Sequence, residues 1–144
     1  DQKLSIIGGP DQVAEKLKNK IKELNLQECI AVTGRVGRSE IGEIYANSNI
    51  GILINSSLNK HSYKYTSPLK YFEYLYMGLK VIGVDFPSHR TLPKNGEIYF
   101  FQENDAFSFE TAVRQALENN QPVESGNNDF SLNTRAKKII SLLG

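Results

Sequence analysis

The segment 44–72 carries positive charge and no compensating negative charge. It contains no Asp or Glu, although the chain has 16 of them, and it holds Lys60, His61, Lys64 and Lys70. Cations without nearby carboxylates create a positive potential that attracts anions. This composition indicates an anion-binding segment, and phosphate groups are typical ligands of such sites.

Ser67 and Pro68 predict the start of a helix, because Ser is favoured as N-cap and Pro at the first helical position. A capping box would place Glu or Gln at position 70, and the sequence has Lys70 there. A cation in the first turn opposes the helix dipole and costs about 0.3–1 kcal/mol. A bound anion would instead be attracted by the backbone N–H groups, the dipole and the ammonium together. A solvated lysine also fits this position, but the cations upstream favour a phosphate site.

Glu73 lies three residues after Lys70, on the same face of the predicted helix. The two residues can form an exposed ion pair worth about 0.2–0.5 kcal/mol. Glu73 can also accept hydrogen bonds from sugar or ribose hydroxyls, because a carboxylate has two acceptor oxygens and no donor. An apolar stripe on the same helix is predicted to face the core, and it comprises Leu69, Phe72, Tyr76 and Leu79.

Apolar runs that are typical of buried strands alternate with helical patterns along the chain. The predicted strands are residues 4–7, 30–33, 50–54, 81–84 and 98–101. The predicted helices are residues 13–24, 40–46, 68–79, 106–119 and, after a loop at 121–129, roughly 132–143. This alternation predicts one α/β domain over residues 1–144, with a Rossmann-like parallel sheet of about five strands and helices on both faces. Ligands of such sheets bind beyond the carboxyl ends of the strands, and here those ends lead into residues 8–10, 34–39, 55–67 and 85–90.

The length and composition are those of one ordinary globular domain, with 144 residues, 40% hydrophobic and 23% charged. A net charge of +1 gives no reason to expect nucleic acid or an anionic membrane as partner. No apolar run approaches the roughly 20 residues of a membrane span, and no signal-peptide pattern is present. The one cysteine, Cys29, is expected to be a buried, inert thiol, in keeping with a cytoplasmic location. The chain starts on a predicted strand without an initiator Met, which suggests a piece of a longer protein.

Several other chemistries are not indicated. One cysteine and two distant histidines, His61 and His89, form no zinc pattern, and no Asp-x-Asp pair is present to hold a divalent cation. The turn that contains His89 and Arg90 is predicted to be solvated rather than to line a pocket. The sequence lacks the Gly-x-Ser-x-Gly elbow, the P-loop and the Gly-x-Gly-x-x-Gly fingerprint. No metal and no cofactor are therefore expected.

Two segments near the middle of the chain carry a family resemblance. Residues 67–74 read Ser-Pro-Leu-Lys-Tyr-Phe-Glu-Tyr, and residues 78–83 read Gly-Leu-Lys-Val-Ile-Gly. They resemble the retaining glycosyltransferases of family 4, in which a helix and the pattern Gly-x-Pro-Val-(Ile/Val)-(Ala/Gly) precede a buried strand of a GT-B fold. Further segments resemble that family in the same order, namely residues 6–10, 31–36, 45–50 and 55–56.

The resemblance implies that the chain is the donor-binding, C-terminal half of a GT-B glycosyltransferase. The donor would be a nucleoside-diphosphate sugar, either a UDP-sugar or a GDP-sugar. Ser67, Pro68, Leu69 and Lys70 would meet the diphosphate, and Glu73 would bind the ribose. Lys70 and Glu73 would be the pair that acts in catalysis.

The resemblance also implies roles outside this helix. Arg35 and Val36 would lie near the base. Gly8 and Gly9 would let the backbone pass close to the donor, although a plain strand-to-helix turn explains them equally well. Tyr65 stands where the family usually has a glutamate that contacts the transferred sugar, so this contact is altered or comes from another group.

Other parts of the machinery would lie outside this sequence. The family's Arg-x4-Lys clamp would precede it by one strand, and the acceptor domain, with any membrane contact, would belong to a missing N-terminal part. Transfer to a glycan or lipid-linked acceptor, as in polysaccharide biosynthesis, would retain the anomeric configuration without a metal. Three alternatives stay open: a nucleotide-sugar epimerase of GT-B architecture, a phosphoacceptor signalling module, and a nucleotide-binding scaffold without catalysis. The signalling module is disfavoured because segments 4–9 and 50–55 offer no acidic pocket.

Overall fold

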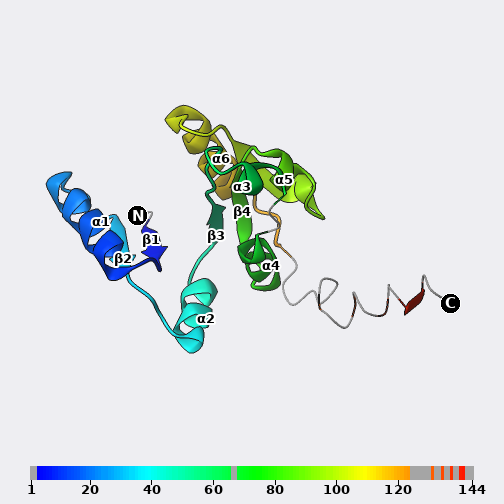
Figure 1. Ribbon diagram of the computed structural model, residues 1–144, viewed down its shortest axis with the longest axis horizontal. Helices are drawn as coiled ribbons and strands as arrows, with labels where there is room; N and C mark the ends of the chain where they lie inside the picture. The colour runs from blue at the N-terminus through cyan, green and yellow to red at the C-terminus, as the bar shows by residue number, and fades with distance from the viewer. Residues whose placement is uncertain are drawn as a thin grey trace. The chain divides into compact units, whose positions relative to one another are not determined.

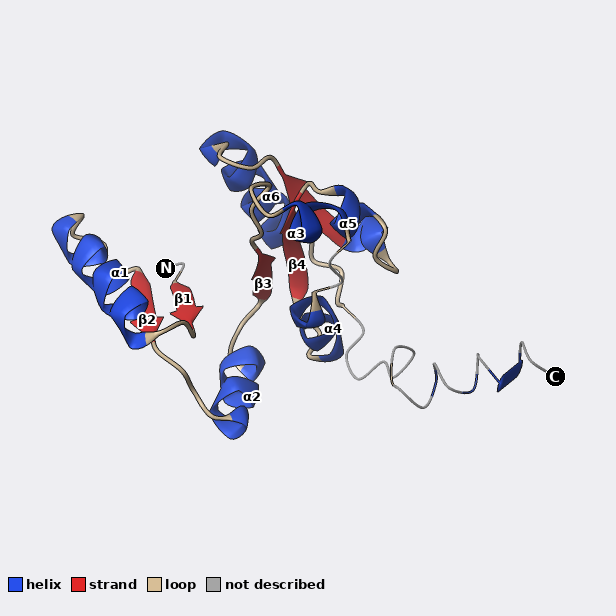
Figure 2. Ribbon diagram, in the orientation of Figure 1, coloured by secondary structure: helices blue, strands red, loops and turns tan. Residues whose placement is uncertain are grey.

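The computed structural model describes residues 3–65 and 68–123, together with residues 131, 134, 137, 140 and 141. The chain divides into two compact units, Asp1–Ile44 and Tyr45–Gly144. Figure 1 follows the elements along the chain, from blue β1 to yellow α6, and Figure 2 separates helices from strands. Each unit has its own parallel strands.

In the first unit, a helix joins two parallel strands. β1 (Leu4–Ile7) pairs with β2 (Ile30–Thr33), and α1 (Asp11–Glu23) makes the crossover that parallel pairing requires. Ala14 and Ile21 are the buried residues of α1, and no residue of β1 or β2 is fully buried. The described part of the first unit therefore has a small core.

α2 (Arg38–Ala46) spans the division between the two units. The backbone N–H of Gly37 donates to Oε2 of Glu40 at 2.7 Å. A glutamate at this position of a helix satisfies the N–H group that the helix leaves open at its start. The last turn of α2 carries Tyr45, which belongs to the second unit.

The second unit has a sheet of three parallel strands. β3 (Ile50–Leu53), β4 (Lys80–Val84) and β5 (Ile98–Phe101) pair in that order, so β4 is the central strand. The helical segments of this unit are α3 (Lys60–Lys64), α4 (Leu69–Tyr76), α5 (Pro87–Arg90), a 3₁₀ turn (Asn95–Glu97) and α6 (Ala106–Glu118).

The side chains of β4 point alternately into two apolar clusters. Val81 belongs to a cluster that includes Tyr71 of α4. Ile82 and Val84 belong to a second cluster, which includes Ala112 of α6. Because successive residues of a strand face opposite sides of the sheet, helices cover this sheet on both faces.

The predicted α/β class with parallel strands is confirmed. β1, β2 and β5 have the predicted bounds, whereas β3 ends one residue earlier and β4 begins one residue earlier than predicted. The described strands form one sheet of two and one of three, in place of a single sheet of about five. An apolar run identifies a strand, but it does not specify which strand edges meet.

Two predictions of burial are wrong. Cys29 is exposed, because it lies in the turn before β2, which begins only at Ile30. His89 is fully buried rather than solvated, since α5 folds over the sheet and brings its Nδ1 within 2.7 Å of the Val84 carbonyl oxygen. The Phe86 ring stacks on the imidazole, with 6.0 Å between ring centroids.

The last part of the chain is described only in places. Residues 121–123 of the predicted loop are irregular, and the rest of that loop and most of the predicted helix 132–143 lie outside the described residues. None of the described helices is both long enough and apolar enough to cross a membrane.

Candidate functional site

α4 begins at Leu69, one residue later than predicted. Pro68 precedes the helix with φ −71° and ψ 122°, so its ring fixes a helical φ while its extended ψ leaves it outside the helix. Ser67, the predicted N-cap, lies outside the described residues, and no described side chain caps this helix start. The first backbone N–H groups of a helix lack the usual partner four residues earlier. At α4 the N–H of Tyr71 donates to the Pro68 carbonyl oxygen at 3.0 Å, so the N–H groups of Leu69 and Lys70 are the ones that could meet a ligand.

Lys70 and Glu73 meet on one face of α4, together with a third side chain. The Lys70 ammonium donates to Glu73 Oε2 at 2.9 Å and to the Tyr45 hydroxyl at 2.7 Å. The Tyr45 hydroxyl in turn donates to Glu73 Oε2 at 2.9 Å. The ammonium also lies 5.4 Å from the centroid of the Tyr45 ring. We refer to Tyr45, Lys70 and Glu73 as the polar trio.

The polar trio is accessible to solvent. The Lys70 side chain is 53% exposed and that of Glu73 is 46% exposed, and an ion pair this open contributes roughly 0.2–0.5 kcal/mol. The pair by itself therefore adds little stability. Its accessibility and its matched charges suit the binding of a polar ligand.

The contacts of the polar trio shift two pKa values. Burial would lower the pKa of Lys70, but the hydrogen bonds from its ammonium to Tyr45 and Glu73 outweigh burial and raise that pKa above its ordinary range. Burial raises the pKa of Tyr45, and the hydrogen bond with Lys70 opposes this change. At neutral pH the trio therefore combines an ammonium, a neutral hydroxyl and a carboxylate.

Tyr74 packs against Tyr45, one member of the polar trio. Its ring meets the Tyr45 ring edge to face, with 5.5 Å between centroids and an interplanar angle of 83°. Tyr74 lies directly against Gly51, the second residue of β3, where any Cβ would collide with the ring. The trio is thus anchored beside the amino-terminal half of β3.

The apolar stripe predicted on α4 is only half correct. Leu79 is buried and Phe72 packs against the core, but Leu69 is 77% exposed and Tyr76 is 51% exposed. Tyr71 and Leu75, four residues apart, occupy the buried face instead. Leu69 therefore turns outward at the start of α4.

The remaining predicted site residues lie on turns. Gly8 and Gly9 follow β1 with φ values of 104° and 86°, a region that L side chains rarely adopt. Arg35 is exposed and Val36 half-buried in the connection from β2 to α2. Tyr65, at the end of α3, is 73% exposed. The structure brings Lys70 and Glu73 of the second unit together. Four other predicted site residues belong to the first unit, namely Gly8, Gly9, Arg35 and Val36.

Polar residues follow the carboxyl ends of β4 and β5, and of these the sequence analysis named only Arg90 individually. Arg90 donates to Asp85 through Nε at 2.6 Å and through Nη2 at 2.9 Å, and Gln102 donates to the same carboxylate at 3.1 Å. The hydrogen bond from Arg90 lowers the pKa of Asp85. Glu103 accepts from the backbone N–H of Ser57 at 3.0 Å. These contacts connect the loops, and the charge of Asp85 is paired with that of Arg90.

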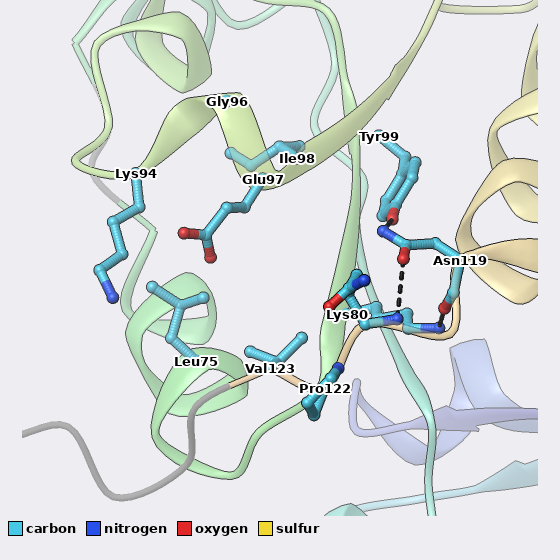
Figure 3. A pocket seen from close by; sticks show the side chains of 11 residues that line it. Leu75, Lys80, Lys94, Gly96, Glu97, Ile98, Tyr99, Asn119, Pro122 and Val123 are labelled. Atoms are coloured by element: carbon cyan, nitrogen blue, oxygen red, sulfur yellow. Dashed lines mark hydrogen bonds between the residues drawn. The ribbon is translucent and has the colours of Figure 1, made fainter.

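A cavity of about 600 Å³ opens at the amino ends of β4 and β5 (Figure 3). One of its two lysines, Lys80, donates to the carbonyl oxygens of Ala116 and Asn119 and so caps the end of α6. Lys94 and Glu97, which also line it, bring opposite charges. The cavity includes neither Lys70 nor Glu73. Of its two lysines, Lys80 already donates to two carbonyl oxygens, and Glu97 offsets the charge of Lys94. The polar trio is therefore the better candidate site.

The fold and the polar trio define a Rossmann-like α/β protein with parallel strands and an accessible lysine–glutamate pair on a helix after β3. Residues 1–119 match the family described as glycosyl transferases group 1, and the chain belongs to this family. The matched residues include every element from β1 to α6. No curated protein and no solved structure matches the chain. The chain is thus a glycosyltransferase domain of the GT-B type, as the resemblance implied, and its place in family 4 stays a prediction.

Proposed function

We propose that this chain binds the donor of a glycosyltransferase, a nucleoside-diphosphate sugar that carries UDP or GDP. The observation that carries the proposal is the pairing of Lys70 with Glu73 at the start of α4, in a chain that belongs to the group 1 family. The Lys70 ammonium suits a phosphate, and the Glu73 carboxylate suits a diol. The acceptor in this proposal is a glycan or a lipid-linked molecule.

Lys70 stabilises the diphosphate in this proposal. An ammonium has three N–H donors, of which two point to Tyr45 and Glu73, so a phosphate oxygen can take the third. The start of α4, which no described side chain caps, adds backbone N–H groups and the positive end of the helix dipole. Negative charge grows on the diphosphate as the sugar departs, and fixed positive groups stabilise that charge more in the transition state than in the ground state.

Glu73 binds the ribose in this proposal, because its carboxylate accepts hydrogen bonds from neighbouring hydroxyls. Ser67, Pro68 and Leu69 line the diphosphate, and exposed Tyr65 stands near the transferred sugar.

For the first unit by itself, we propose donor contacts at two turns. Gly8 and Gly9 give the donor a close approach to the backbone, and Arg35 and Val36 meet the base. Transfer proceeds with retention, without a metal or a cofactor, on the cytoplasmic side.

A binding titration tests this proposal. The 144-residue chain is titrated with UDP, GDP and their sugars by calorimetry, and the Lys70→Ala variant is expected to bind about 10- to 100-fold more weakly, since a charged hydrogen bond to phosphate is lost. Lys20→Ala is the matched control, because Lys20 is an exposed lysine that pairs with the glutamate three residues later, as Lys70 does, but lies on α1, outside the cationic segment 44–72. Equal affinity of Lys70→Ala and the unchanged chain, or no binding of any nucleotide at millimolar concentration, would contradict the proposal.

A further inference from the structure

Tyr45 approaches the Lys70–Glu73 pair from a different helix. It lies in the last turn of α2, and its hydroxyl contacts both members of the pair at once, at 2.7 Å from the Lys70 ammonium and 2.9 Å from Glu73 Oε2. A hydroxyl can accept one hydrogen bond and donate another. Tyr45 therefore satisfies two opposite charges with a single atom.

The Tyr45 side chain is held more firmly than the two side chains that it contacts. A tyrosine ring has few rotatable bonds, whereas Lys and Glu have long, flexible side chains that lose much rotamer freedom when ordered. The edge-to-face contact with Tyr74 restrains the Tyr45 ring, and Gly51 leaves room for the Tyr74 ring directly on β3. A rigid chain of contacts thus runs from the strand to the charged pair.

We propose that Tyr45 is a positioning residue of the donor site, which orders Glu73 and Lys70 before the nucleotide arrives. This inference rests on the proposed function. Ordering the two side chains in advance removes part of the entropy cost from the binding step. The greatest benefit falls on the ribose contact, because the Glu73 carboxylate must point at two neighbouring hydroxyls while Lys70 still reaches the diphosphate.

The test compares ribose with deoxyribose in the presence and absence of the Tyr45 hydroxyl. Affinities of the 144-residue chain for UDP and GDP, and for their 2′-deoxy forms, are measured by calorimetry. The unchanged chain is expected to prefer the ribose form of its nucleotide by about 5- to 10-fold, which is the net effect of one ordinary hydrogen bond. Tyr45→Phe keeps the ring and removes the hydroxyl, and it is expected to reduce this preference to about twofold or less.

Tyr76→Phe is the matched control, since Tyr76 is an exposed tyrosine of the same helix, at the last residue of α4, and is not a member of the polar trio. It should keep the full preference for ribose. Circular dichroism melting of both variants shows that each is folded, and a general loss of stability would weaken both nucleotide forms equally and leave their ratio unchanged.

The outcomes separate this inference from the proposed function. If the unchanged chain binds a nucleotide and prefers ribose, but folded Tyr45→Phe keeps that preference, Tyr45 is not a positioning residue and the proposed function stands. If the unchanged chain binds no nucleotide, or binds both sugar forms equally, the role proposed for Glu73 fails and the role of Tyr45 fails with it. A lost preference in Tyr45→Phe alone supports the inference.

Discussion

The two units of the molecule both contain parallel, largely apolar strands, but these strands differ in how deeply they are buried. Four of the five residues of β4 are buried, whereas neither β1 nor β2 has a fully buried residue. The sheet of the second unit is covered on both faces by α4 and α6, and the first unit has α1 as its crossover helix. An apolar strand thus becomes a core strand only when helices cover both of its faces.

This difference bears on the proposed donor site. The polar trio rests on the well-packed second unit, while Gly8, Gly9, Arg35 and Val36 lie on turns of the first unit. Preorganised groups contribute more to binding than groups that must be ordered first. We therefore expect the diphosphate and ribose contacts to outweigh the base contacts.

The largest expected effect comes from truncating the central strand. Ile82 is 0% exposed, and Ile82→Ala should lower the free energy of unfolding of the second unit by about 2–5 kcal/mol, because it removes buried methylene groups and leaves a cavity. The same substitution at half-buried Ile6 of β1 should cost only about 1 kcal/mol. Native-state hydrogen exchange measures the stability of the two units separately. Equal losses of stability at the two positions would contradict the difference in core packing between the units.

A smaller effect is expected from the lysine at the start of β4. Lys80 donates to the Ala116 carbonyl oxygen at 2.7 Å and also to that of Asn119. Lys80→Met keeps the length of the side chain but removes its donors, and should destabilise the second unit by about 1–2 kcal/mol.

Lys20→Met is the matched change in the first unit. Lys20 is 64% exposed and pairs with Glu23 at 3.3 Å, so the variant should stay within about 0.5 kcal/mol of the parent. Urea denaturation followed by circular dichroism compares the two variants, and a smaller loss for Lys80→Met than for Lys20→Met would contradict this ranking.

The smallest expected effect on stability at neutral pH comes from the protonation of His89. Burial lowers its pKa, although the hydrogen bond with the Val84 carbonyl and the charge of Asp85 partly oppose this change. The unfolded state therefore takes up a proton more readily than the folded state, so this contribution to stability is complete above the ordinary histidine pKa of about 6.5 and is lost as the pH falls below it.

Denaturation at a series of pH values between 7 and 5 measures this loss. His89→Gln should flatten the slope in the second unit. The first unit contains neither of the two histidines of the chain, so its hydrogen exchange should lack the histidine-dependent slope. A slope that persists in His89→Gln would show that another group causes it.

Sequence reasoning located the strands well, because the run 30–32 is apolar and is followed by polar Thr33, and the run 98–101 is apolar or aromatic and is followed by polar Gln102. It also placed Lys70 beside Glu73, since residues three apart share a helix face. It misplaced Leu69 and Tyr76, because α4 is short and hydrophobic on more than one side. Local periodicity therefore predicted elements better than it predicted orientation.

The rest of the site depends on contacts between residues that are distant in sequence. Tyr45 lies 25 residues before Lys70, and no spacing rule links a residue at the end of one helix to the start of another. His89 follows polar Ser88 and precedes charged Arg90, so its neighbours suggested a solvated turn. Only the fold of α5 against β4 reveals that the imidazole is buried.

Gly51 has no side chain and no chemical role, yet it determines where charged groups can gather on the surface beside it. A methyl group at this position would occupy the space of the Tyr74 ring. Displacement of that ring would take away the support beneath Tyr45, and the carboxylate and ammonium would lose their common partner. An inert position inside a strand can thus constrain evolution of a binding surface as strictly as the residues that touch the ligand.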